Sequence, residues 1–520
     1  MTSKIAKGSI VILLGAFLFR IGGWIYRVLM ANLLGPAGYG ILGLTLPSQG
    51  FLIIIAGAGL PPAIAKFVAE YKAKKDYAMV REVISVSTKL MIIMGIVFGV
   101  IMYFIAEPLA IGLFHKPEAV LPFKLIALIT PFSVVVGALR GTFQGLYQMT
   151  NILITRAVEL IFMIMVAVSL VLAGAYVAGA VIGTAVGFMA AMVAAIILFR
   201  KHVWNEISTP HNLLERAEKT FTFREDLGLV KTLLLFSIPV VITGLAELAL
   251  YDMGTFVIGV YMPSEAIGYY NAASPIARLP LIISMAVATS VLPATSEAMG
   301  LKDRHLLHTY ILQSYRYVSL SVLPLCVGTV IFATPILQLV YFGSAYLPAS
   351  AALQILAAGM LFFTLYTISS SISQGLGKPM LPMFVLILGT TVDVGLSILL
   401  VPPFGINGAA LATTIASFII MATLAWKTLQ LAQLKLPIGD FGKIIIASLL
   451  MGVVFLFFPK TRTFLILALI IAPFLYIGIL SVIGGLKKDD IHALYKLGNK
   501  LGPLSGYFKK VVGFFERFAT

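Results

Sequence analysis

The sequence predicts an all-α polytopic membrane protein with about 14 transmembrane helices. Hydrophobic residues make up 60% of the 520 residues, and only 11% are charged. The mean hydropathy is +1.02. A soluble protein of this length has no interior large enough to hide so much apolar surface, so most of it must face lipid or other helices. The apolar runs are long and unbroken, whereas a β-barrel would show short alternating segments.

The individual spans follow from the length that a helix needs to cross the hydrocarbon core, about 20 mainly apolar residues. The stretches that meet this requirement lie near 8–31, 40–65, 83–106, 119–146, 150–173, 177–199, 231–256, 265–292, 306–333, 349–373, 380–401, 405–426, 440–458 and 463–485. The first stretch is much longer than the apolar region of a signal peptide and has no small-residue cleavage site. We therefore expect it to be a retained span.

Basic residues are unevenly divided between the two sides of these spans. The connections 66–81 and 200–231 are rich in lysine and arginine, whereas the opposite side carries only Lys116, Lys460 and Arg462. The positive-inside rule therefore predicts a multi-pass protein of the cell membrane with both termini in the cytoplasm. The net charge of +16 comes largely from these loops and the tail. Because this charge is scattered over membrane loops, we expect membrane lipids as partners and no nucleic acid. We also expect a monomer.

Short motifs recur at an offset of about 230 residues. Gly38-Tyr39 returns as Gly268-Tyr269, and GAVIGT at 179–184 returns as GAALAT at 408–413. Six spans per copy is an even number, so the copies insert the same way up, as parallel lobes related by a pseudo-twofold axis along the membrane normal. The predicted organisation is an N-terminal six-helix lobe at 1–204, a cytoplasmic linker at 205–230, a C-terminal six-helix lobe at 231–431, an extra helix pair at 432–486 and a basic amphipathic cytoplasmic tail at 487–520.

Three longer segments resemble a known family. They are LLGPAGYGILGLTLP at 33–47, YYNAASPIARLPLIISMAVATSVLPATSE at 269–297 and GINGAALATTIA at 405–416. They look like the polysaccharide flippase and SpoVB-like branch of the multidrug/oligosaccharidyl-lipid/polysaccharide exporter superfamily. An extra C-terminal helix pair is shared with the lipid II flippase relatives. This resemblance implies alternating-access movement of a saccharide linked to a polyprenyl phosphate or diphosphate, from the inner to the outer leaflet.

The resemblance also implies a set of headgroup-binding residues. Lipid II flippases use arginines on their first, second and eighth spans, and Arg20 and Arg27 match the first-span pair while Arg278 matches the eighth-span arginine. The second-span arginine has no counterpart in 40–65. The resemblance therefore does not extend to lipid II itself as the cargo, and it leaves a diphosphate-type headgroup open.

The residues themselves favour a cationic cavity for an independent reason. An arginine inside a span costs roughly 2.5–3.5 kcal/mol on insertion scales, so an intramembrane arginine indicates a function. Arg20, Trp24 and Arg27 share one helical face, and a guanidinium grips phosphate in bidentate geometry. The alternative is that Arg27 snorkels to the outer interface and Arg20 pairs with a buried acid. Arg140 and Arg156 are expected at the cytoplasmic interface.

Two acids form a second candidate site. Glu247 and Asp393 are predicted at similar depth in the C-terminal lobe. Lipid II flippase relatives bind sodium with acids on the seventh and eleventh spans and a threonine on the twelfth, a role that Thr413 or Thr414 would fill here. The hypothesis is a coupling site for Na⁺ or H⁺. The alternative is a structural pair with a buried cation.

Several function classes find no support in the sequence. There is no HExxH motif and no P-loop, and the single cysteine, Cys326, cannot form an intramolecular disulfide or a metal cluster. The loops are too short and too poor in acids and histidines for a membrane enzyme. We therefore expect a transporter rather than an enzyme, with no cofactor beyond a coupling ion and no metal centre. The alternative function is a cation-coupled multidrug antiporter of the same superfamily, which predicts an acid rather than arginines in the central cavity.

Overall fold

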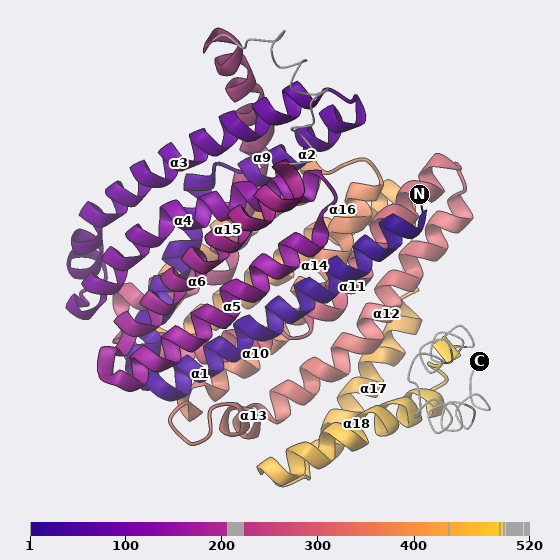
Figure 1. The fold of residues 1–520 in the computed structure, drawn as a ribbon. Coiled ribbons are helices and arrows are strands. Elements are labelled where there is room, and N and C mark those ends of the chain that lie inside the picture. The colour runs from indigo at the N-terminus through magenta and orange to yellow at the C-terminus, as the bar shows by residue number, and fades with distance from the viewer. Residues whose placement is uncertain are drawn as a thin grey trace. The chain divides into compact units, whose positions relative to one another are not determined.

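The computed structural model describes the backbone of residues 2–204, 223–434 and 437–487, together with 490, 491, 495 and 513. Residues 2–20, 223–227 and 438 are described by their backbone alone. The linker residues 205–222 and nearly all of the predicted tail lie outside this part. Throughout the described part the regular structure is helical, which confirms the predicted fold class (Figure 1).

The helices follow the predicted spans closely. They are α1 (Thr2–Gly57), α2 (Leu60–Ala73), α3 (Tyr77–Glu107), α4 (Val120–Gly145), α5 (Met149–Leu170), α6 (Tyr176–Leu198), α9 (Phe223–Tyr261), α10 (Ser264–Ala277), α11 (Leu281–Gly300), α12 (Arg304–Ile331), α13 (Ala333–Val340), α14 (Ser350–Gly375), α15 (Met380–Phe404), α16 (Ile406–Ala432), α17 (Ile438–Leu456) and α18 (Arg462–Val482). Among the described residues, 12 helices are long and apolar enough to cross a membrane.

Continuous helices account for the difference between this count and the predicted number of spans. Residues 149–204 form one helical run of 56 residues, but its backbone turns at Gly174, where φ is 91°. Helix α1 likewise contains the first span and the beginning of the second, separated by a kink at Gly35 with φ 66° and ψ 177°. Each run therefore holds parts of two predicted spans.

Two predicted spans are interrupted within their length. The second, at 40–65, stops at Gly57 and resumes as α2 at Leu60. The eighth, at 265–292, breaks between the end of α10 at Ala277 and the start of α11 at Leu281. Such breaks free backbone groups that membrane proteins tolerate only where protein or a cavity surrounds them.

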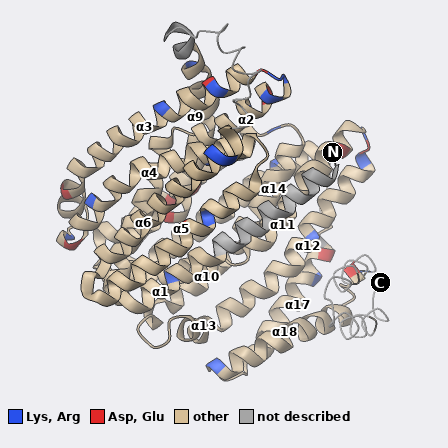
Figure 2. Cartoon of the chain, viewed as in Figure 1, with Lys and Arg blue, Asp and Glu red and all other residues tan. Residues whose placement is uncertain are grey.

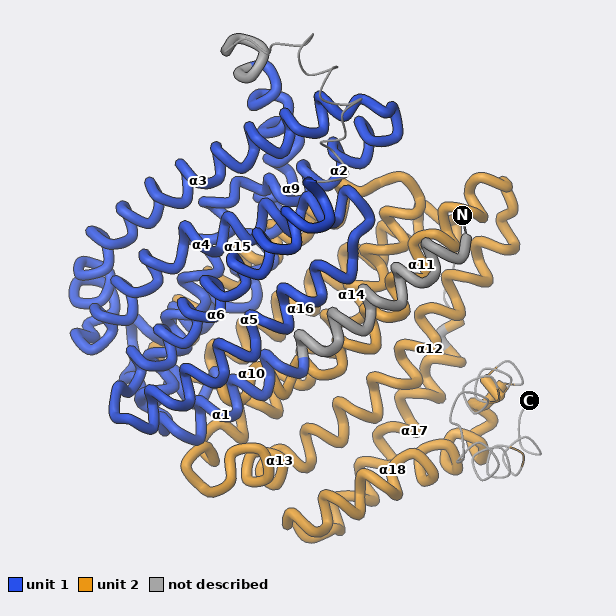
Figure 3. The backbone as a smooth tube through the Cα atoms, in the orientation of Figure 1, with its two compact units in different colours: residues 1–271 blue, residues 272–520 orange. Residues whose placement is uncertain are grey.

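The chain divides into two compact units, residues 1–271 and 272–520, which Figure 3 colours separately. In unit 1, apolar side chains of α2, α3 and α4 form a core around Ile64, Val83 and Phe143. In unit 2, one core joins α11, α12, α14 and the end of α16. A second core of unit 2 packs α17 and α18 against the α12–α13 region, so the extra helix pair is docked on this unit.

The sequence repeat has a structural counterpart inside each unit. Gly145 of α4 lies directly against the carbonyl of Ala65 in α2, so a Cβ at this position would meet backbone. Gly375 of α14 lies against the Thr295 side chain and the Leu292 carbonyl of α11. Both partners are displaced by 230 residues, since 375 − 145 and 295 − 65 give the same value. Only glycine allows helices to approach this closely.

The outer faces of the helices are apolar and the charges gather elsewhere. Large apolar side chains such as Phe104 and Val482 are 73% and 86% exposed, which fits contact with lipid tails. Figure 2 shows that lysine, arginine, aspartate and glutamate lie mainly near helix ends and connections. Asp76 and Asp303 cap α3 and α12, each accepting a hydrogen bond from the backbone N–H three residues later.

Candidate functional site

Helix α1 carries the first group of predicted headgroup residues. Arg20 belongs to this helix, but its side chain lies outside the described part. Trp24 buries its indole Nε1–H with no hydrogen-bond partner in the described structure. Arg27, one turn further on, is half-buried, and its guanidinium reaches the Tyr39 hydroxyl across the kink at Gly35. Trp24 and Arg27 thus place an indole and a guanidinium donor on one helical face.

Contacts on other faces of α1 hold this helix in unit 1. The Tyr26 hydroxyl donates to the Ala180 carbonyl of α6 at 3.0 Å and lies 3.4 Å from Thr184 Oγ1. Gly22 packs against the Leu160 side chain of α5. Helical periodicity turns Tyr26 about 200° from Trp24. The anchoring contacts therefore lie on a different face of α1 from the one that carries Trp24 and Arg27.

In unit 2, Arg278 lies at the break between α10 and α11. Its backbone N–H donates to the Ser274 carbonyl at 3.2 Å, and its own carbonyl accepts from Leu281 N–H at 3.1 Å. Its side chain is half-buried. Substrate and ion sites of transporters are often formed where a transmembrane helix is discontinuous. Arg278 therefore occupies the kind of position in which such sites are found.

Asp393 of α15 is the centre of a buried polar cluster in unit 2. It is completely buried, and neither carboxylate oxygen has a hydrogen bond of good geometry in the described structure. The polar groups that act on it are the Thr413 hydroxyl of α16 and the charge of Arg278. One turn away on each helix, the buried Ser397 and Ser417 hydroxyls also lack a partner in the described part.

These orphaned oxygens are the observation that bears on a bound cation. Burying polar groups without partners costs free energy, and hard cations prefer carboxylate and hydroxyl oxygens. Asp393 with the Thr413 hydroxyl beside it is therefore of the chemical kind that suits Na⁺, or a proton held on the carboxyl group. Thr414 does not join them, because its hydroxyl donates to the Ile355 carbonyl of α14 at 2.9 Å.

The other predicted coupling residue is described within the other compact unit. Glu247 is on α9 in unit 1 and its side chain is exposed there, whereas Asp393 belongs to unit 2. The surroundings of each acid are therefore those of its own unit. Among the described residues, no three or more histidine, cysteine, aspartate or glutamate side chains form a group suited to a metal ion. A cation at Asp393 would rest on one carboxylate with neutral oxygens.

One buried ion pair was not predicted from the sequence. Arg140 of α4 donates to Glu159 of α5 at 2.6 Å, and its Nε–H donates to Thr155 Oγ1 at 3.1 Å. The side chains of Arg140 and Glu159 are only 14% and 8% exposed. Arg140 is thus a buried partner of an acid. Its partner is 19 residues away, across the turn between two spans.

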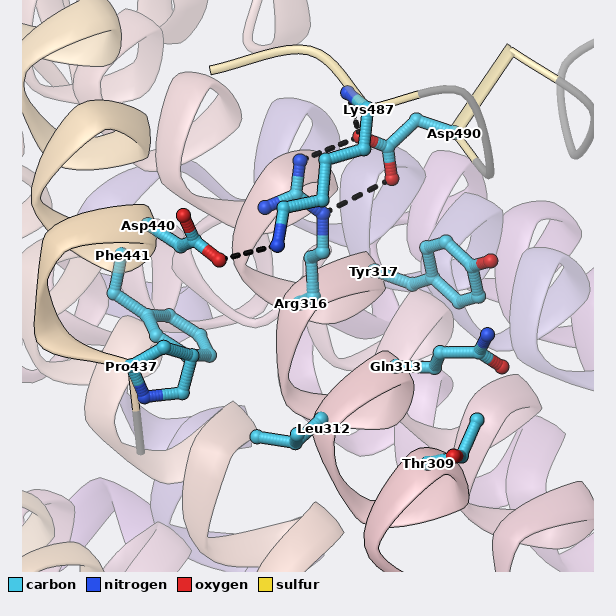
Figure 4. Close-up of a pocket in the computed structure, with 10 residues that line it drawn as sticks. All are labelled: Thr309, Leu312, Gln313, Arg316, Tyr317, Pro437, Asp440, Phe441, Lys487 and Asp490. Atoms are coloured by element: carbon cyan, nitrogen blue, oxygen red, sulfur yellow. Dashed lines mark hydrogen bonds and ion pairs between the residues drawn. The ribbon is translucent and has the colours of Figure 1, made fainter. Parts of the chain in front are cut away.

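A pocket of about 190 Å³ lies between α12, α17 and the segment after α18 (Figure 4). Arg316 donates to both oxygens of Asp490, at 3.1 and 2.5 Å, and to the Gly485 carbonyl at 2.7 Å. Lys487 forms an ion pair with Asp440 at the edge of the same pocket. The two cations are matched by two carboxylates, so this clasp is electrically balanced and fastens the segment after α18 to α12.

The comparisons with known proteins agree with this geometry. The model of a family described as polysaccharide biosynthesis protein matches residues 5–299, more than half of the chain. The chain belongs to this family. The model of the MatE family matches residues 239–399 of the same chain, within the multidrug/oligosaccharidyl-lipid/polysaccharide exporter superfamily.

Relatives of this polysaccharide biosynthesis family member cover most of its length. It is 27% identical over 477 residues to the uncharacterized membrane protein YabM of Bacillus subtilis (strain 168), covering 88% of this chain and 86% of that protein. It is 24% identical over 450 residues to the lipid II flippase MurJ of the same organism, covering 80% of each chain.

The fold is also found among solved structures. A lipid II flippase MurJ in an inward closed conformation superposes with a TM-score of 0.71 at 20% identity, covering 91% of this chain and 98% of that one. Where these names print a role, it is that of a lipid II flippase rather than of an enzyme, in agreement with the prediction that this chain is not an enzyme. The chain is therefore a membrane transport protein of this superfamily.

Proposed function

We propose that this protein is a flippase that moves a saccharide linked to a polyprenyl phosphate or diphosphate from the inner to the outer leaflet by alternating access. The observation that carries the proposal is the pair of donors on α1. Trp24 and Arg27 present an indole N–H and a guanidinium inside a span, and in the described part of the chain neither meets a carboxylate. An anionic headgroup is the partner that satisfies both donors.

Arg278 extends this argument to unit 2. It sits at a helix break, half-buried, where a phosphate oxygen has access to a guanidinium without crossing an intact helix. Arg20 shares the helical face of Trp24 and Arg27 by spacing, so we assign it to the same headgroup. The polyprenyl tail stays among the exposed apolar faces of the helices, so only the headgroup has to cross the membrane.

Asp393 with Thr413 supplies the energy coupling in this proposal, through Na⁺ or H⁺, and Glu247 is the second acid of the coupling pathway. A cation bound at Asp393 neutralises the carboxylate that otherwise acts on Arg278. Binding of the ion therefore changes the charge that an anionic headgroup meets at Arg278. This link gives a physical route by which an ion gradient biases headgroup binding.

The orientation with both termini in the cytoplasm belongs to the same proposal. It rests on the basic connections at 66–81 and 200–231. We place the protein in the cell membrane as a monomer, with the lipid-linked saccharide and bulk membrane lipids as its partners.

A transport assay with matched arginine variants tests the headgroup site. Purified protein is reconstituted in liposomes with a fluorescent short-chain polyprenyl diphosphate carrying one N-acetylhexosamine, and a membrane-impermeant quencher follows its passage between leaflets. Arg20→Ala, Arg27→Ala and Arg278→Ala are each expected to slow passage roughly tenfold or more, since hydrogen bonds to charged groups are worth about 1.5–3 kcal/mol. Arg304→Ala is the control, because Arg304 is exposed and bonds Gln433. Wild-type rates in all three variants would refute the site.

A cation-coupled multidrug antiporter remains the second candidate function. The match of the MatE family model to residues 239–399 and the buried carboxylate of Asp393 favour it. Native mass spectrometry of protein gently extracted from its own membrane separates the two functions. A copurified polyprenyl diphosphate-sugar that is lost in Arg27→Ala supports the flippase. Bulk phospholipid alone, together with ion-driven efflux of a cationic dye, supports the antiporter.

A further inference from the structure

A buried lysine joins two distant parts of unit 1. Lys116 lies in the connection between α3 and α4 and is only 5% exposed. Its ammonium donates to the carbonyls of Phe114 at 2.9 Å, Gly259 at 2.6 Å and Met262 at 2.9 Å. All three N–H groups of the ammonium are therefore used, and every acceptor is a backbone oxygen.

The position of two of these acceptors explains why a lysine is found here. Gly259 lies in the last turn of α9, and Met262 follows its end at Tyr261. The last carbonyls of a helix have no partner within the helix and form the negative end of its dipole. Lys116 caps the end of α9 from a connection that is 143 residues away in the sequence.

Neighbouring side chains reinforce this contact. The ring of Phe114 stacks on Phe256 of α9, with centroids 6.1 Å apart. Glu118 accepts a hydrogen bond from the Ser264 hydroxyl at the start of α10, at 3.0 Å. Glu118 is exposed and borders an open pocket of about 270 Å³, so water competes for its carboxylate. The buried ammonium is therefore the stronger of the two polar contacts.

Beside this contact, α1 and α10 cross with their backbones touching. A Cβ at Gly40 would overlap the Ser264 carbonyl, and a Cβ at Gly268 would overlap the Pro36 carbonyl. Such a crossing packs closely but gains only dispersion energy, which no single bond directs. The described side-chain hydrogen bonds that join the first part of the chain to α9 and α10 at this end come from Lys116 and Glu118, together with a 3.4 Å bond from the Tyr39 hydroxyl to the Asn271 carbonyl.

This contact joins the two copies of the sequence repeat. The α3–α4 connection belongs to the first repeat, whereas α9 and α10 begin the second. Transporters built from two such repeats open toward one side by separating them at that end. We propose that Phe114, Lys116 and Glu118 form an outer latch, which holds the repeats together at the predicted extracellular end and must release α9 and α10 in every transport cycle. Lys116 is thus a positioning residue that touches no cargo.

Opening of the latch replaces hydrogen bonds within the protein by hydrogen bonds to water. When the latch opens, the ammonium and the three carbonyls each bond to water, so the net cost per hydrogen bond is far below its gross strength. A charge held by neutral carbonyls leaves more readily than one held by a buried carboxylate, which would keep its own desolvation penalty. The choice of acceptors therefore suits a contact that forms and breaks repeatedly. The inference rests on the alternating access of the proposed function and is independent of its cargo.

Side-specific labelling of a buried cysteine tests the latch. In a Cys326→Ser background, Thr45→Cys places a thiol at a completely buried position on α1, roughly 7 Å deeper than Gly40 at 1.5 Å per residue. A membrane-impermeant maleimide is added to either side of sealed vesicles. Lys116→Met is expected to speed labelling about tenfold from the external side alone. Lys116→Arg, which keeps a cationic donor, is expected to restore most of the protection.

Two controls separate a latch from a merely structural contact. Lys124→Met removes a partly exposed lysine near the same end, which pairs with the exposed Glu107 and lies over the Tyr103 ring, and is expected to leave labelling unchanged. Faster labelling of Lys116→Met from both sides, or no change from either side, would overturn the proposal. Because the assay uses no lipid-linked saccharide, its outcome is separate from that of the headgroup test.

A reversible cross-link supplies the converse experiment. Glu118→Cys and Ser264→Cys, whose native side chains meet at 3.0 Å, are bridged by a short disulfide-forming bifunctional reagent. The bridged protein is expected to lose passage of the fluorescent lipid and external labelling of Thr45→Cys, and reductant is expected to restore both. Retained external labelling in the fully bridged protein would contradict the latch. Loss of labelling in a protein that never transports would support the latch and refute the cargo.

Discussion

The clasp between Arg316 and Asp490 allows a quantitative prediction about the extra helix pair. The two side chains are only 10% and 5% exposed, and Asp490 also accepts from the Lys487 backbone N–H at 2.9 Å. Asp490→Asn keeps the shape of the side chain but leaves the Arg316 charge buried without a counter-ion. Breaking a buried pair in this way costs about 3–5 kcal/mol, whereas an exposed pair is worth about 1 kcal/mol or less.

The sole cysteine of the chain provides the assay. Cys326 is 4% exposed and lies on α12, the helix that also carries Arg316. The denaturant concentration at which a maleimide begins to react with Cys326 therefore reports the opening of this part of unit 2. We expect Asp490→Asn to lower that concentration strongly. Lys487→Gln is the control and is expected to lower it little, because Lys487 and Asp440 are 44% and 27% exposed.

A double substitution completes the cycle. Replacing a buried ion pair by apolar residues of similar size is often neutral, so Arg316→Met/Asp490→Leu is expected to recover most of the stability that Asp490→Asn loses. The reasoning fails if Asp490→Asn and Lys487→Gln have the same effect. It also fails if the double variant is less stable than Asp490→Asn alone.

Three further predictions concern buried charges. Glu159→Gln is expected to destabilise unit 1 by about 3–5 kcal/mol in detergent unfolding, because it leaves Arg140 unpaired, whereas Glu107→Gln, at an exposed pair, changes stability by less than about 1 kcal/mol. Burial lowers the pKa of Lys116 below 10.5, against the opposing charges of Glu118 and Glu265. Between the lowered pKa and 10.5, Lys116 is protonated in the unfolded chain but neutral in the folded chain. The free energy of unfolding should therefore rise with pH across that window in the parent protein but not in Lys116→Met. Asp393→Asn is expected to abolish the dependence of transport on a Na⁺ or H⁺ gradient while leaving ungated lipid passage measurable, and unchanged ion dependence would exclude Asp393 from coupling.

The fold was accessible from the sequence because membrane insertion imposes a simple length rule. Apolar runs of about 20 residues were sufficient to predict the helices, and the repeat offset indicated that they form two copies. The breaks were not accessible in this way. Hydropathy changes little around Gly57 or Arg278, because a broken helix and an intact one use the same apolar residues. The breaks depend on packing against neighbouring helices.

The candidate site was also predicted only in part from the sequence. Helical spacing placed Trp24 and Arg27 on one face, and residue type alone marked Arg278 and Asp393 as costly charges in a membrane. That Arg278 acts on Asp393 required the fold, since the two residues are 115 positions apart, from 393 − 278. The pairing of Arg140 with Glu159 was equally hidden, because sequence spacing relates residues within one helix and not across two.

The glycine contact that occurs once in each unit also bears on how the two repeats arose. Gly145 against Ala65 and Gly375 against Thr295 are the same helix crossing at the same offset. A crossing so close leaves no room for a larger side chain at either glycine, which fits descent of both from one crossing in a segment that was later duplicated. An ancestral chain of six spans that inserted in one orientation would have worked as a symmetric homodimer, with both copies facing the same way. After such a duplication each copy is free to specialise, and in this chain the second copy holds the completely buried Asp393.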